Sequence, residues 1–121
     1  MAIIGNSRLR RVTGITPRDR DRILDFLQGA IYCWCKNRPA EWFSLRDLMG
    51  GENFHWNGTP LIALWTKHDG HSRNPVKEAG KEAGCLLKAV IVRDPRTFRT
   101  RESPSQIREY QWDSTVPVPH E

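Results

Sequence analysis

Two long stretches of the chain place apolar residues three and four positions apart. The first begins at Thr16-Pro17, where a hydroxyl can cap a helix and proline suits the first turn. Its apolar positions are Ile23, Phe26, Leu27, Ala30, Ile31 and Trp34. This spacing predicts a helix over residues 17–36, which Pro39 helps to end because proline restricts the residue before it.

The second stretch follows Asn74-Pro75, a cap and proline of the same kind. Its apolar positions are Val76, Ala79, Ala83, Leu86, Leu87 and Val90. They predict a helix from residue 75 to about residue 92. Gly80 and Gly84 lie on one face of this helix, and because glycine weakens a helix, we expect another segment to pack closely against them.

Shorter elements are predicted between the two long helices. Trp42-Phe43 forms a short extended segment, and Ser44 with Asp47 three positions later forms the cap of a helix of one to two turns. A third cap followed by proline, at positions 59 and 60, starts a further short helix over residues 60–68. The region between the long helices is therefore also mainly helical.

The last third of the chain changes its pattern. Residues 97–101 and 107–112 alternate apolar and polar side chains, which predicts a β-hairpin. Residues 1–15 and 113–121 show no periodicity, so we expect a flexible basic arm and a flexible tail. The fold class is then α+β, mainly helical, with three to four helices and a C-terminal hairpin in one domain over residues 16–112.

Composition narrows the functional classes. The 121 residues suffice for one domain, and 19 Lys and Arg against 14 Asp and Glu give a net charge of +5, which favours anionic partners. No apolar run reaches the ~20 residues of a membrane span, and we expect a cytoplasmic protein without a membrane partner. Cys33, Cys35 and Cys85 are an odd set, so we expect reduced thiols.

The order of these elements resembles the winged-helix family over residues 16–112, although no diagnostic motif accompanies it. The resemblance implies that residues 75–91 are a recognition helix for the major groove and that residues 97–112 are the wing. The chain departs from that family in the extra helix at 60–68. Residues 15–51, rich in tryptophan and arginine, also resemble small proteins carried by phages and prophages.

Basic residues gather on both implied contact elements. Five arginines fall within sixteen residues of the wing, and we expect a locally positive strip that can pair with phosphates. The candidate nucleic-acid contacts are Arg73, Asn74, Lys77, Lys81, Arg96, Arg99, Arg101 and Arg108. On the recognition helix, Glu78 and Glu82 offset Lys77, Lys81 and Lys88, which argues against tight non-specific binding.

Other residues are candidates for an interface. Most tryptophans are expected in the core, but Trp56 lies in a polar stretch and is predicted to be exposed, as tryptophans at interfaces are. Arg10 and Arg11 of the N-terminal arm are candidates for the same role or for a minor-groove contact.

Catalytic and metal-binding functions have little support. Cys33 and Cys35 are two positions apart on a helix and point in different directions, which disfavours a shared zinc ion. His55, Asn57, His68 and His71 faintly resemble a nuclease site, but the spacings differ and no paired cysteines accompany them. No nucleophile elbow, phosphate-binding glycine loop or dinucleotide fingerprint occurs. We expect no enzyme activity, metal or cofactor, with a metal-dependent nuclease as the minority alternative.

Three functional hypotheses follow. The first is a nucleic-acid-binding protein, with double-stranded DNA favoured, that is a phage-derived regulator. The second is a small phage protein resembling anti-CRISPR inhibitors, which binds a host protein complex through the same surface; the positive net charge argues against mimicry of DNA. The third is a homodimer that buries a tryptophan-rich surface.

Overall fold

The computed structural model describes residues 11–51 and 56–119. In chain order its elements are α1 (Pro17–Asn37), α2 (Leu45–Leu48), α3 (Ile62–His68), α4 (Pro75–Arg93), β1 (Phe98–Glu102) and β2 (Arg108–Trp112). The fold is therefore α+β, with helices followed by an antiparallel hairpin, as the sequence pattern predicts.

The two long helices begin at the predicted caps. The side-chain oxygen of Thr16 accepts a hydrogen bond from the backbone N–H of Asp19 at 3.0 Å, and that of Asn74 accepts one from Lys77 at 3.1 Å. Each cap satisfies a backbone donor that has no partner inside the helix. Both predicted helices are confirmed, and each extends one residue beyond its predicted end.

The short helices depend on local hydrogen bonds as well. Ser44 and Asp47 form a reciprocal capping box at the start of α2. At α3 the Thr59 hydroxyl accepts from the backbone N–H of Leu61 at 3.2 Å, within a turn that precedes the helix. The helix predicted over residues 60–68 is thus present, but it begins two residues later, at Ile62.

The hairpin is joined by a third, very short extended segment. β1 and β2 pair antiparallel, and on the other side of β2 the backbones of Phe43 and Tyr110 exchange two hydrogen bonds of 2.8 Å. The predicted extension at Phe43 is confirmed. The ring of Phe43 packs edge-on against that of Phe98, with 6.2 Å between centroids, so this bridge carries part of the core.

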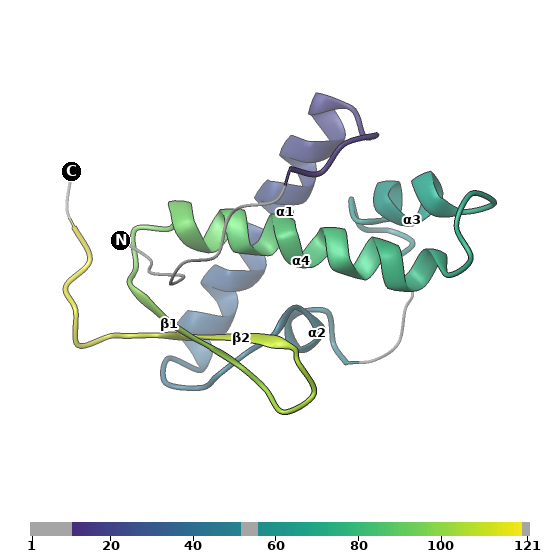
Figure 1. Cartoon of the computed structure of the whole chain (residues 1–121). Coiled ribbons are helices and arrows are strands. Elements are labelled where there is room, and N and C mark those ends of the chain that lie inside the picture. The colour runs from purple at the N-terminus through teal and green to yellow at the C-terminus, as the bar shows by residue number, and fades with distance from the viewer. Residues whose placement is uncertain (1–10, 52–55, 120–121) are drawn as a thin grey trace.

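Figure 1 shows how the other elements are arranged around α4. α4 crosses α1, α3 packs beside the N-terminal half of α4, and the hairpin and α2 lie on the other side of α4. Along α1 one face is buried, and its members are Ile23, Leu24, Leu27, Ile31 and Cys35. α4 buries the face that contains Leu86, Leu87, Val90 and Ile91. One core therefore serves all the elements.

The packed region begins before α1. Val12 is only 4% exposed and belongs to the core, so the prediction of a loose arm up to residue 15 is wrong for this part of the chain. At the other end the backbone N–H of Asp113 donates to the carbonyl of Thr97 at 2.8 Å, after which residues 114–117 are exposed. Among the described residues, no helix is both long and apolar enough to cross a bilayer.

Candidate functional site

A line of lysines runs along the solvent side of α4. Lys77, Lys81 and Lys88 are four and seven residues apart, which places them on one face of the helix, and the first two are exposed. Lys88 is half-buried; its burial, together with the nearby Arg108 guanidinium, lowers its pKa. The basic face of α4 therefore extends toward the hairpin at Arg108.

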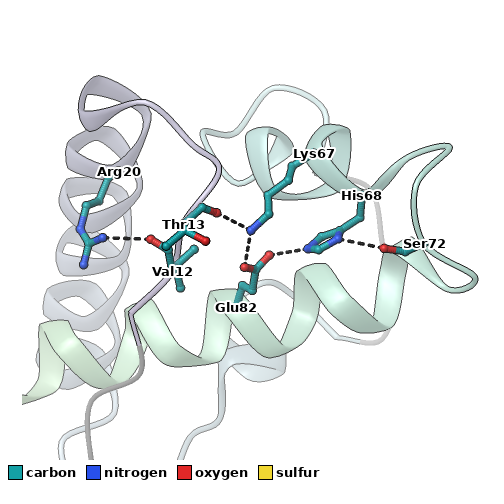
Figure 2. Close-up of polar contacts among 7 residues, drawn as sticks. All are labelled: Val12, Thr13, Arg20, Lys67, His68, Ser72 and Glu82. Carbon is teal, nitrogen blue, oxygen red and sulfur yellow. Dashed lines mark hydrogen bonds and ion pairs between the residues drawn. The ribbon is translucent and has the colours of Figure 1, made fainter.

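The two glutamates of α4 point in different directions. Glu78 lies on the solvent side, where its carboxylate is 3.8 Å from the ammonium of Lys81. Glu82 instead faces α3, where its carboxylate accepts hydrogen bonds from Lys67 and His68, and its side chain is only 14% exposed (Figure 2). The expectation that both glutamates would sit near bound phosphates is therefore wrong for Glu82.

The Glu82 cluster is a closed network. Burial opposes ionisation of the Glu82 carboxyl, but the hydrogen bonds from Lys67 and His68 outweigh burial and lower its pKa. Because an ionised carboxylate only accepts, His68 donates through Nε2, and its Nδ1 lies 3.0 Å from the hydroxyl of Ser72. Lys67 also donates to the carbonyl of Thr13, which ties the N-terminal segment to α3 (Figure 2).

Arg108 joins the α4 lysines from the hairpin. Alternate residues of a strand point to the same side, so Arg108 shares the inward face of β2 with Tyr110. Its guanidinium lies 3.7 Å from the carboxylate of Glu102 and 3.3 Å from the hydroxyl of Thr100. Together with Lys77 and Lys81, its side chain lines one pocket of about 770 Å³ between α2, α4 and the hairpin turn.

The glycines of α4 form part of the wall of this pocket. Both Gly80 and Gly84 line it, and a Cβ atom added at Gly84 would meet nothing within 4 Å. The expectation of a segment packed closely against this face is therefore wrong at Gly84. The glycine leaves open space where a side chain would otherwise project.

The remaining wing arginines lie on the other face of the hairpin. Arg99 and Arg101 alternate with the buried Phe98 and point outward. Arg99 is 3.3 Å from the carboxylate of Asp113, and Arg101 is 2.8 Å from that of Glu109. The arginines of the predicted positive strip therefore do not form one strip, because Arg108 lies on the opposite face from Arg99 and Arg101, and these three and Arg96 each lie near a carboxylate.

Arg96 has a structural role. Its guanidinium pairs at 2.7 Å with Asp94, whose side chain is fully buried, and it lies 5.7 Å from the ring centroids of Tyr32 and Trp112. Gln28 of α1 donates a second hydrogen bond to the same carboxylate at 2.7 Å. The side chain of Arg96 is 14% exposed, so the structure places it within the fold and not on the candidate contact surface.

The other predicted contact residues are scattered. Arg73 is exposed just before α4, whereas the side chain of Asn74 is occupied as the helix cap. Trp56 is 5% exposed and belongs to the core, so the prediction that it is an exposed interface residue is wrong. Arg11 is exposed, and Arg10 lies outside the described residues.

No metal centre assembles in the part of the chain that the structure describes, since no three His, Cys, Asp or Glu side chains there are grouped to hold an ion. Cys33 is exposed whereas Cys35 is buried, which agrees with their predicted divergence, and burial raises the pKa of Cys35 to about 11. His68 belongs to the Glu82 cluster, His71 is exposed and His55 lies outside the described residues.

The structure thus brings together Lys77, Lys81 and Arg108 from the predicted set. It adds Lys88 and the pocket, neither of which sequence reasoning placed at the site. The sequence contains a signal for Lys88, because it lies eleven residues after Lys77 and therefore on the same face of a helix. It contains no comparable signal for the pocket, which forms between three separate elements. Comparisons with protein-family models, with curated proteins and with solved structures find no match for this chain.

Proposed function

We propose that the protein binds nucleic acid, with double-stranded DNA favoured, through the basic face of α4. The observation that carries this proposal is the arrangement of charge along the helix. Lys77, Lys81 and Lys88 line one face beside Arg108, while the carboxylate of Glu82 is turned away and neutralised by α3. Among the described residues, a phosphate backbone laid along α4 would meet these cations, opposed by Glu78 beside Lys81 and by Glu102 beside Arg108.

The arrangement of the elements supports the same proposal. A hairpin follows α4, and an extended residue between α1 and α2, Phe43, bridges to β2. This order and pairing resemble a winged helix, in which the helix before the hairpin enters the major groove and the wing touches the backbone. In the proposed complex α4 is the groove element, and Arg108 is the hairpin cation nearest to it.

The ion pairs on the outer face of the hairpin are shorter than those on this basic face, where Lys81 lies 3.8 Å from Glu78 and Arg108 lies 3.7 Å from Glu102. Arg99 and Arg101 each lie within 3.3 Å of a carboxylate, and both point away from the face of β2 that carries Arg108. We therefore propose that these two arginines contribute less to binding than Lys77 and Lys81. The two pairs have the same formal charge, which makes them a matched comparison.

The test is fluorescence anisotropy of a labelled DNA duplex over a range of salt concentrations. The double variant Lys77→Ala/Lys81→Ala should bind at least about tenfold more weakly and lower the salt slope by about two. The variant Arg99→Ala/Arg101→Ala loses the same charge and should change affinity by less than about threefold. An equal loss in both variants would contradict the α4 site, and absence of wild-type binding at low salt would contradict the function.

A protein partner is a second candidate, favoured by one observation. Tyr32 on α1 is 51% exposed, and tyrosine is a residue type enriched where proteins bind each other tightly. An inhibitor of a host protein complex would use this surface, which is separate from the lysines of α4. Stoichiometric co-purification of a partner that Tyr32→Ala abolishes, without affinity for bare DNA, would favour this candidate.

A further inference from the structure

The described residues that line the pocket beside the basic face give it a mainly apolar wall. Its walls come from three elements: Met49 follows α2, Gly84 lies on α4 and Ile107 precedes β2. Leu87 and Tyr110, which are both buried, also line it. At about 770 Å³ it falls within the range of pockets that enclose a ligand of drug size, a class that includes a single nucleotide.

The charged side chains among the described lining residues of this pocket are all basic. Among the described residues that line it, four are cationic and none is acidic. The cations are Arg46, Lys77, Lys81 and Arg108. Lys77 and Lys81 stand on the α4 side, whereas Arg108 stands on the hairpin side. The pocket therefore suits a ligand with an apolar ring in the middle and negative charge on both flanks.

We propose that the pocket receives one unstacked nucleotide of the bound nucleic acid. The base enters over the backbone of Gly80 and Gly84, the phosphate on one side meets Lys77 and Lys81, and the phosphate on the other side meets Arg108. This inference rests on the proposed function and deepens it. Because removal of a base from a perfect duplex opposes binding, the preferred duplex is one that already carries an extrahelical base.

The glycines give this assignment a physical reason. Glycine is unfavourable in the middle of a helix, and the fold does not require it at Gly84, where an added Cβ would meet open space. Any larger side chain there would project into the pocket that Gly84 lines. Glycine at this position therefore keeps the pocket open, and packing within the protein does not require it.

The experiment compares three labelled DNA probes of one length: a perfect duplex, the same duplex with a one-nucleotide bulge, and a single strand. The wild-type protein should bind the bulged duplex about tenfold more tightly than the perfect duplex, and the single strand no more tightly than the bulged duplex. Gly84→Leu should remove this preference, so that the variant binds the bulged and the perfect duplex with affinities within about twofold of each other.

Gly29→Leu is the matched control. Gly29 also lies inside a helix with open space around it, on α1 and away from the pocket, so the variant should keep the wild-type preference. Competition with a free nucleoside monophosphate distinguishes two kinds of pocket. If the pocket binds isolated nucleotides, the monophosphate displaces the probes at low concentration. If binding needs the flanking phosphates of a strand, it does not.

The outcomes distinguish this inference from the function on which it rests. If the wild type binds all three probes equally, or if Gly84→Leu keeps the preference, the pocket does not take a base, and duplex binding still stands. If none of the three probes binds, the proposed function fails and the inference fails with it. Thermal unfolding of both leucine variants checks that any loss of preference does not come from loss of the fold.

Discussion

Replacement of Gly84 by alanine should stabilise the protein. Gly84 lies near the middle of α4, and a Cβ atom at this position would meet nothing within 4 Å, so the substitution introduces no clash. Alanine is better than glycine inside a helix by about 0.8–1 kcal/mol, because the unfolded chain has fewer conformations to lose. For a domain of this size, a gain of that magnitude raises the melting temperature by roughly 3–5 °C.

The assay is urea denaturation followed by circular dichroism, with Gly70→Ala as the matched control. Gly70 also has open space around it, but its φ of 78° lies in the left-handed region, where a Cβ is strained. That variant should lose about 1–2 kcal/mol. If Gly84→Ala loses stability as Gly70→Ala does, α4 does not leave this face open, and the argument for a glycine that serves the pocket is refuted.

Two further predictions concern buried charge. Because the pKa of Glu82 is lower in the folded protein than its ordinary 4.5, its ionised form stabilises the fold above that pH, and this stabilisation is lost as pH falls through the folded pKa. Between about pH 5 and pH 3, urea denaturation should therefore show a steeper loss of stability for the wild type than for Glu82→Gln; parallel curves would contradict this. Asp94→Ala should lose about 3–5 kcal/mol in the same assay because Arg96 remains without its buried partner, and Asp94→Asn, which keeps an acceptor, should lose less.

The helices and the hairpin could be predicted because their signals are local. A cap lies three residues from the N–H that it satisfies, as at Thr16 and Asn74, so sequence spacing alone locates the start of a helix. α3 shows the limit of this reasoning. Its first turn is formed by the backbone around Thr59, and the helix begins two residues beyond the position that the cap and proline indicate.

Burial was harder to predict where local and distant signals disagree. Trp56 has polar neighbours in the sequence, which suggest exposure, yet it packs into the core. A large apolar side chain is buried when the fold offers a space for it, whatever its neighbours along the chain. Val12 shows the same effect in a segment without periodicity, since its burial depends on packing against the core and on the contacts of Arg20 and Lys67 with its backbone and that of Thr13.

The charge of the candidate surface depends on pairings that residue counts do not reveal. Two of the hairpin pairings follow from register, since Arg101 stands opposite Glu109 and Arg108 opposite Glu102. The pairing of Glu82 with Lys67, 15 residues before it, requires α3 to fold against α4, and no local pattern indicates it. The local count therefore overstates the basic character of the hairpin and understates that of α4. Because attraction to phosphates depends on the charges left on one face after internal pairing, α4 and not the outer face of the hairpin is where binding should be tested first.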